Sequence, residues 1–228
     1  MTRVKTAAFL LAGIAILQTP AAFAQQADPP KARFEVGLGS LWIGRQPLGS
    51  KSATETTGAG TTLTLFTASS ELASAAGLAG RIGVRLTRSL VAEAEASYLE
   101  PQVRIAIGGD FEGASPVTAT ETVQQLTIGG GVRWNFSNRH WTPRFTPFAM
   151  AGGGLLRQLH ERGTLLETGR YYQVGGGATY LLVPGRHFHT KGIGARVDAA
   201  ALVRSKGVAF DGGSKTSPAV GVSAFVRF

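Results

Sequence analysis

Ten charged residues occupy alternate positions in segments that otherwise consist of small and apolar residues, and their types suit ion pairing. Arginine binds carboxylates especially well, because its planar guanidinium group donates two parallel hydrogen bonds. Arg85 and Glu93 flank the short segment "TRSL" (87–90), which makes them predicted neighbours on adjacent strands. The full set of four acids and six arginines is Glu35, Arg81, Arg85, Glu93, Glu95, Arg133, Arg196, Asp198, Arg204 and Arg227.

The histidines are weaker candidates for chemistry. A hydrolase needs a nucleophile activated by a base that a third group orients. His160 lies next to Glu161, but the sequence pairs it with no serine, so we predict no catalytic residue. His187 and His189 in "HFH" supply two imidazoles, whereas a structural zinc site takes four ligands, and we predict no metal site.

Two glycine-rich runs could suggest phosphate-binding loops. However, "AGGGLL" (151–156) and "GGGATY" (175–180) lie inside alternating segments, with no helix and no Lys-Ser or Lys-Thr pair after them. We therefore predict small interior residues at these positions, and no cofactor.

Apolar residues recur at every second position through most of the chain, which predicts β-strands. Most of these segments are longer than the five or six residues of an ordinary strand, and long enough for a tilted strand to cross a membrane. In 146–161 we assign Phe148, Met150 and Leu156 to the outward face. The eight predicted strands cover 34–42, 78–87, 92–99, 124–136, 146–161, 170–183, 193–205 and 217–228.

Eight apolar faces are too many to bury within one chain of this size, but lipid can cover all of them. A closed barrel also pairs every backbone group and leaves no open edge in the hydrocarbon. A soluble β-sandwich would carry many Lys, Glu, Thr and Asn on its polar faces, whereas glycine and alanine crowd these faces here. We therefore predict an all-β fold, an eight-stranded antiparallel up-and-down transmembrane β-barrel over residues 33–228.

The connecting segments alternate in length, as in barrels with short periplasmic turns and long outside loops. The shorter ones are 87–90, 137–144 and 184–192. The others tend to be longer and richer in Gly, Ser and Thr, and the first of them is expected to hold an extra hairpin around 61–67. They cover 45–77, 106–120, 162–169 and 207–217.

The N-terminus predicts an exported protein. Basic residues precede an apolar run from Ala7 to Leu17, and Ala22-Phe23-Ala24 forms an A-x-A-like cleavage site, so residues 1–24 have the form of a secretory signal peptide. A transmembrane anchor is the alternative, but the run is short and Pro20 follows it closely. Residues 25–32 form a short segment before the barrel.

Export decides how the charge is interpreted. Without the first 24 residues the net charge is +7, and the basic residues are scattered, so we expect no nucleic-acid partner. The chain has no cysteine, which excludes disulfides, thiolate metal sites and a cysteine nucleophile.

Aromatic residues fall near the two ends of the predicted strands. If the first strand runs upward from the periplasm, they form two belts, as expected at the two membrane interfaces. The predicted belt residues are Phe34, Trp42, Tyr98, Trp134, Phe136, Phe148, Tyr172 and Tyr180, with Phe228 at the chain end.

In this pattern the chain resembles the small eight-stranded outer-membrane barrels of Gram-negative bacteria, the OmpA-type and OmpX-type proteins, over about 33–228. The last strand, "SPAVGVSAFVRF" (217–228), ends in Phe228. In that family, a last strand with a terminal aromatic residue looks like the signal that the barrel assembly machinery binds. The resemblance therefore implies an assembly signal at Phe228, location in the bacterial outer membrane, and two partners, namely membrane lipid and the assembly machinery.

We expect a structural or surface-interaction role through the extracellular loops 45–77 and 106–120, with an unidentified partner and no enzymatic activity. The interior charges leave two interpretations open. One is a closed ion-pair network that fills a narrow interior. The other is a porin-like narrow channel for small solutes or ions. A lipid A-modifying enzyme is a further alternative, since some small outer-membrane barrels have that activity.

Overall fold

The computed structural model describes residues 33–136, 144–160, 166–184, 192–205 and 214–228. The predicted signal peptide (1–24), the segment 25–32, and the histidines His187 and His189 lie outside these ranges. No helix within the described ranges is long and apolar enough to cross a membrane. The regular elements there are eleven strands: β1 (Phe34–Ile43), β2 (Gln46–Thr56), β3 (Thr62–Leu72), β4 (Ala75–Arg85), β5 (Leu90–Leu99), β6 (Gln102–Gly108), β7 (Val117–Asn135), β8 (Phe145–His160), β9 (Leu166–Pro184), β10 (Gly192–Ser205) and β11 (Lys215–Arg227).

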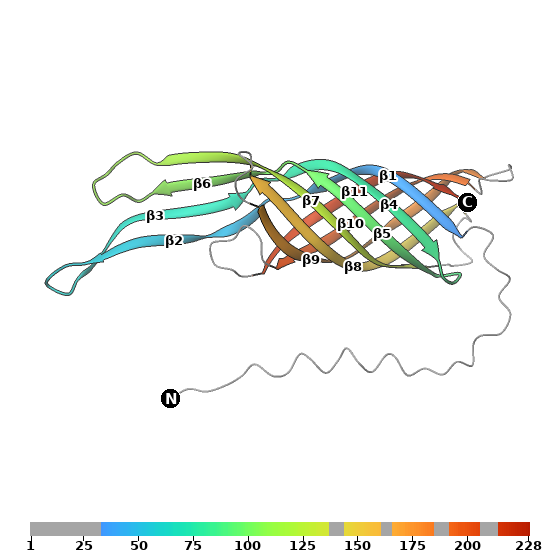
Figure 1. Cartoon of the computed structure of the whole chain (residues 1–228), viewed down its shortest axis with the longest axis horizontal. Helices are drawn as coiled ribbons and strands as arrows, with labels where there is room; N and C mark the ends of the chain where they lie inside the picture. The colour runs from blue at the N-terminus through green and yellow to red at the C-terminus, as the bar shows by residue number, and fades with distance from the viewer. Residues whose placement is uncertain (1–32, 137–143, 161–165, 185–191, 206–213) are drawn as a thin grey trace, which may run out of the picture. The chain divides into compact units, whose positions relative to one another are not determined.

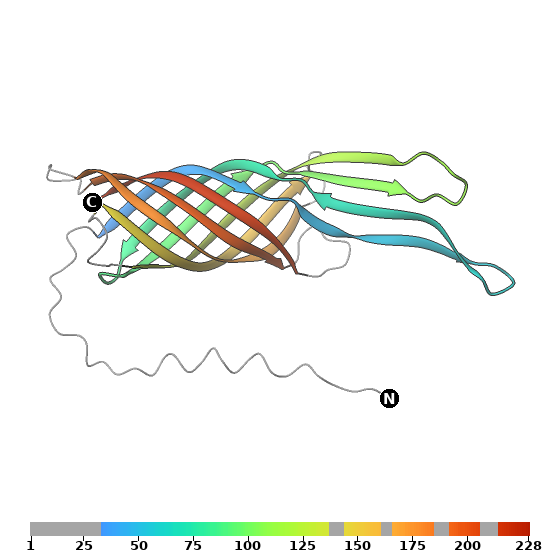
Figure 2. The same cartoon turned by 180° about the vertical axis from the view of Figure 1, so that it is seen from behind.

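Eight of these strands close into a barrel. Hydrogen-bonded neighbours follow the order β7-β5-β4-β1-β11-β10-β9-β8, and β8 pairs with β7 to complete the ring. Every pairing in the ring is antiparallel. Figures 1 and 2 show the tilted strands wrapped around one axis. The predicted eight-stranded antiparallel barrel is confirmed.

The remaining strands form a sheet that continues beyond one mouth of the barrel (Figure 1). It contains β2, β3, β6 and the first six residues of β7 (117–122), paired in that order. Only two residues separate β1 from β2, β3 from β4 and β5 from β6, so each barrel strand leads almost directly into the outer sheet. This four-stranded unit is termed the extension, and the opposite mouth, where Phe34 and Phe228 lie, is termed the terminal rim.

The prediction of loops is wrong for most of 45–77 and for seven of the fifteen residues of 106–120. The hairpin expected around 61–67 exists, but it spans 46–72 as β2 and β3, and β6 and β7 occupy both ends of the second segment. These segments are rich in threonine, whose β-branched side chain favours strands. A composition typical of loops therefore concealed the length of the first hairpin and the existence of the second, β6–β7.

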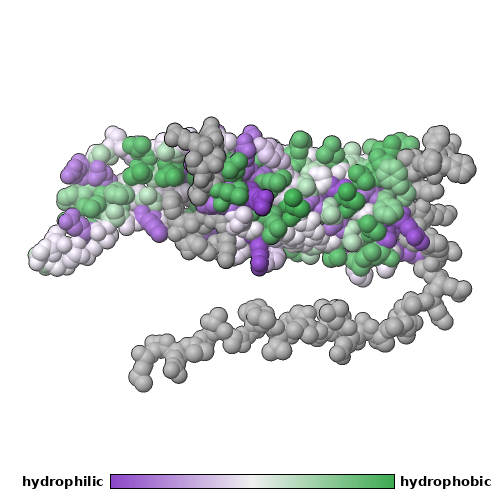
Figure 3. All heavy atoms as spheres, in the orientation of Figure 1, coloured by the Kyte–Doolittle hydropathy of each residue, from purple (hydrophilic) through white to green (hydrophobic). Residues whose placement is uncertain are grey.

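The outward face of the barrel strands is apolar. Leu38, Leu78, Ile128, Leu155 and Val174 each expose more than half of their surface. Figure 3 shows apolar side chains spread over the barrel surface in view. Exposed apolar surface of this extent is unusual for a soluble monomer, and its position on a closed sheet matches the lipid-facing band of a membrane barrel.

The face predicted for β8 is wrong. Phe148, Met150 and Leu156 point into the barrel and are buried, whereas Ala149 and Leu155 are exposed. Up to Leu156 both faces of β8 are apolar or small, so the period of two did not distinguish inside from outside. The interior also holds arginine side chains that stack on an aromatic ring, and this gives Phe148 a favourable place there. Phe148 is therefore not a belt residue.

Glycine residues make room for large interior side chains. Gly129 on β7 lies opposite Gly154 on β8. A Cβ atom at position 129 would collide with the hydroxyl group of Tyr171 and lie 2.5 Å from the carbonyl oxygen of Gly153. Tyr171 is almost fully buried in an apolar cluster, so the missing side chain at Gly129 is what allows the tyrosine to fit.

We expect Gly129→Val to lower the free energy of unfolding by about 1–3 kcal/mol, because the added side chain overpacks the interior. Gly80→Val is the matched control, since a Cβ atom there has no neighbour within 4 Å. Urea unfolding in lipid vesicles, followed by the emission of the exposed Trp42 and Trp134, measures both. Equal losses in the two variants would contradict this account of Gly129.

Candidate functional site

Eight of the ten predicted charges are linked by seven ion pairs into one continuous set, termed the ion-pair chain. Its N–O distances range from 2.7 to 3.2 Å. It contains four arginines and four acids, so its formal charge is zero. In order of contact, the residues are Arg227, Glu35, Arg133, Glu93, Arg196, Asp198, Arg81 and Glu95.

The ion-pair chain is shielded from solvent. Arg133, Arg196 and Asp198 are buried. The ring of Phe148 lies beneath two of the guanidinium groups, with its centroid 5.4 Å from Arg133 Cζ and 4.6 Å from Arg196 Cζ. The Sδ atom of Met150 accepts a hydrogen bond from Arg196 Nη2 (3.3 Å). Aromatic, thioether and carboxylate groups surround these arginines in the low-dielectric interior, where an unpaired charge would be costly. Arg133 Nε alone of their guanidinium nitrogens is buried without a hydrogen-bond partner in the described part of the chain.

Strand register does not place Arg85 directly opposite Glu93, and the two residues form no ion pair within the described ranges. The β4–β5 hairpin centres on Arg88, so Arg85 lies opposite Val91. Glu93 lies two residues further along β5, and its carboxylate binds Arg133 and Arg196 across the interior. This prediction is wrong because the turn is displaced from the position assumed for it.

Arg85 and Arg204 lie outside the ion-pair chain. Among the described residues, neither forms an ion pair. Arg204 is buried near the extension, opposite Lys215, and its Nε atom has no hydrogen-bond partner in the described part of the chain. Arg85 is half-buried at the terminal rim.

A polar layer that the sequence did not reveal lies inside the barrel beside the extension. Gln46, Gln125 and Gln158 are all buried, and Gln158 Nε2 donates to Gln125 Oε1 (3.3 Å). The alternation of inward residues in β7 and β8 could have identified Gln125 and Gln158.

The Nδ1 atom of His160 lies 2.9 Å from Glu121 Oε1, but His160 Nε2 contacts no hydroxyl group within the described ranges. Among the described residues, this geometry supplies a base and an orienting carboxylate but no nucleophile.

Seven of the predicted belt residues lie on the outer surface of the barrel, all with substantial exposure, and so does Phe228. They are Phe34, Trp42, Tyr98, Trp134, Phe136, Tyr172 and Tyr180. Phe228 also closes the rim, because its N–H donates to Phe34 O (2.9 Å) and its backbone oxygen accepts from Arg33 N–H (3.0 Å). Its role as an assembly signal stays a prediction.

One face of the extension carries exposed apolar residues. Ile107 lies opposite Val117 on β7 and opposite Ala68 on β3, and Phe66 shares the face of Ala68. Phe66, Ile107 and Val117 are 40%, 43% and 63% exposed. These three residues are termed the extension stripe. Nearer the barrel, the same face continues into a buried cluster that includes Leu72 and Val103.

The closed ring, with its apolar outer surface and paired interior charges, decides the fold class. The chain has the fold of a small outer-membrane β-barrel. No protein-family model and no curated protein matches the sequence.

Solved structures of similar fold include Neisserial surface protein A, with 17% identity, 85% of this chain and 95% of that chain covered, and a TM-score of 0.45. OprG, an outer membrane protein from Pseudomonas aeruginosa, has 12% identity, coverage of 86% and 95%, and a TM-score of 0.44. The outer membrane protease OmpT from Escherichia coli has 10% identity, coverage of 90% and 99%, and a TM-score of 0.38. At these identities the likeness concerns the fold and indicates no particular role.

Proposed function

We propose that this protein is a non-enzymatic barrel of the bacterial outer membrane that holds the extension outside the cell as a protein-binding surface. The observation that carries this proposal is the extension stripe, which leaves apolar side chains uncovered on a sheet beyond the barrel. Exposed apolar surface rimmed by polar residues is typical of protein–protein interaction sites.

The barrel itself supports the membrane location. Its outward face is apolar around a closed ring, and no barrel strand has an open edge, which is what a hydrocarbon environment requires. The terminal rim has the tight β4–β5 turn, whereas the opposite mouth bears the extension. Short turns face the periplasm and long segments face outward in bacterial barrels, so the extension lies outside the cell.

The charge of the extension suggests which partner surface it would accept. Residues 45–72 and 100–122 contain three basic and six acidic residues, a net charge of −3, in a chain that is basic as a whole. A protein partner with an apolar patch and a basic rim would complement this surface.

The orientation can be tested with single cysteines, because the chain has no native cysteine to interfere. We expect Thr57→Cys, in the β2–β3 turn, to react with a membrane-impermeant maleimide on intact cells. Ser89→Cys, in the β4–β5 turn, should react only after the outer membrane is permeabilised. Labelling of Ser89→Cys alone on intact cells would place the extension in the periplasm and refute the proposed surface role.

The binding surface can be tested by photocrosslinking in intact cells. We expect a photoreactive amino acid at Ile107 to form adducts with a protein partner, because this position lies in the extension stripe. Ala106, an exposed neighbour on the opposite face of β6, is the matched control. Adducts at Ile107 alone would support the proposal. Equal yields at both positions, or none at either, would contradict it.

A further inference from the structure

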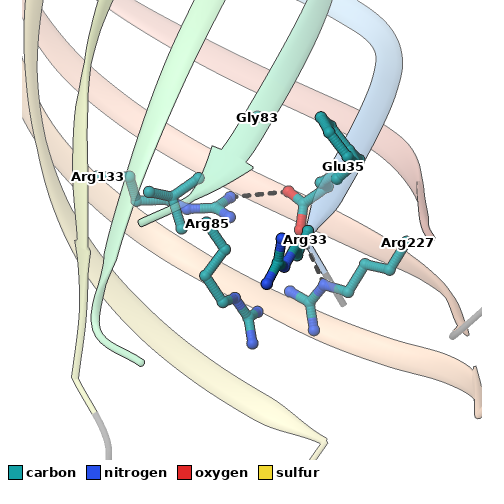
Figure 4. A pocket seen from close by; sticks show the side chains of 8 residues that line it. Arg33, Glu35, Gly83, Arg85, Arg133 and Arg227 are labelled. Carbon is teal, nitrogen blue, oxygen red and sulfur yellow. Dashed lines mark hydrogen bonds and ion pairs between the residues drawn. The ribbon is translucent and has the colours of Figure 1, made fainter. Parts of the chain in front are cut away.

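A small pocket opens at the terminal rim, and arginine dominates its lining. The residues that line it include Arg33, Glu35, Gly83, Arg85, Arg133 and Arg227. In Figure 4 the side chains of Arg33, Arg85 and Arg227 extend to the same side of the Glu35 carboxylate. Four arginines thus line the pocket together with one acidic residue, Glu35.

The single carboxylate is already fully engaged. Glu35 Oε1 accepts from Arg133 (2.9 Å), and Glu35 Oε2 accepts from Arg227 (2.8 Å). Arg133 Nη1 also forms an ion pair with Glu93 Oε1 (3.1 Å). Arg33 and Arg85 have no carboxylate partner within the described ranges, so the pocket carries a surplus of positive charge.

The backbone holds the surplus arginines together. The N–H of Arg85 donates to the carbonyl of Arg33 (2.8 Å), so the two residues are direct neighbours on adjacent chain segments. Gly83 lies opposite Glu35, and a Cβ atom there would lie 3.2 Å from Val91 Cγ1, so a larger residue would crowd this wall of the pocket. Like charges held this close repel one another unless an anion lies between them.

We propose that this pocket binds a phosphate group. Guanidinium groups match the geometry of phosphate oxygens, and a phosphate would neutralise the surplus charge of Arg33 and Arg85 without disturbing the ion-pair chain. Two sources supply the same chemistry at a membrane rim, namely soluble phosphate and the phosphodiester of a phospholipid head group. In either case, the phosphate oxygens would accept hydrogen bonds from the same guanidinium groups.

The experiment is calorimetric titration of the whole folded protein in a non-ionic detergent. One arm uses inorganic phosphate, and the other uses a short-chain phosphatidylglycerol that presents a phosphodiester. We expect Arg85→Gln to weaken binding about 10- to 100-fold in each arm that shows binding, as expected for loss of a charge-assisted hydrogen bond. Arg33→Gln should weaken it similarly, and this substitution keeps the backbone hydrogen bonds of residue 33 to Arg85 and Phe228.

Arg104→Gln, an exposed arginine on the extension, is the matched control and should bind like the unaltered protein. Binding in only the lipid arm would identify the head group as the source, and binding in only the other arm would identify soluble phosphate. The proposal is overturned if neither ligand binds, or if Arg85→Gln and Arg33→Gln bind as well as Arg104→Gln does.

Discussion

Arg81→Met is expected to lower the free energy of unfolding by about 3–5 kcal/mol, the cost of leaving a buried charge without its partner. Arg81 is the next-to-last residue of the ion-pair chain and binds Glu95 at 2.8 Å and Asp198 at 3.2 Å. In this variant Asp198 still forms its ion pair with Arg196, whereas Glu95 has no other ionic partner among the described residues. Urea unfolding in lipid vesicles measures the loss.

A second change separates charge from packing. Glu95→Gln in the Arg81→Met background removes the unpaired charge and should restore most of the lost stability, because well-packed neutral residues can replace a buried pair. Arg104→Met provides the control for loss of an exposed arginine and should change stability little. If the double variant were as unstable as Arg81→Met alone, the volume of Arg81, and not its pairing with Glu95, would be the stabilising factor.

The purified protein should show no single-channel steps in a planar bilayer, in contrast to a general porin tested in the same apparatus. The reason is the neutral, buried ion-pair chain, which joins side chains from β1, β4, β5, β7, β10 and β11 across the interior. An eight-stranded barrel has room inside for little more than such side chains.

Arg133→Ala tests the same interpretation from the other side. It removes a fully buried side chain, but Arg196, Phe148 and Asp198 remain in the interior. We therefore expect the variant to stay closed as well. Regular conductance steps in the unaltered protein, changed by Arg133→Ala, would instead support the narrow channel and refute the closed interior.

The sequence predicted the barrel because lipid and the interior impose opposite demands on alternate residues. Leu38 and Leu78 point outward, and Arg81 and Glu95 point inward, as their positions in the alternation required. Where this contrast vanished, the prediction failed. Up to Leu156, β8 is apolar or small on both faces, so only the folded interior, with its arginines, shows that Phe148 belongs inside.

The candidate site was only partly accessible from sequence for a related reason. Alternation identifies which charges share the interior, but a pair forms only if the register and shear of the strands bring two side chains together. Glu93 and Arg196 are 103 positions apart in sequence, yet Arg196 Nη1 lies 2.7 Å from Glu93 Oε1. No local sequence pattern links the two residues. The extension stripe escaped notice because Ile107 and Phe66 lie in threonine-rich segments and form one surface only through cross-strand pairing.

The seam between β1 and β11 bears on how the chain folds. Glu35 and Arg227 meet there although 192 positions separate them in sequence, so the ring closes only when the last strand is in place. Contacts of such long range carry a large loop-closure cost and slow folding. Until closure, β1 and the growing edge of the sheet both present unpaired backbone groups, which favour aggregation. A chain truncated before Lys215 would keep those two edges open permanently, and we expect it to aggregate or be degraded.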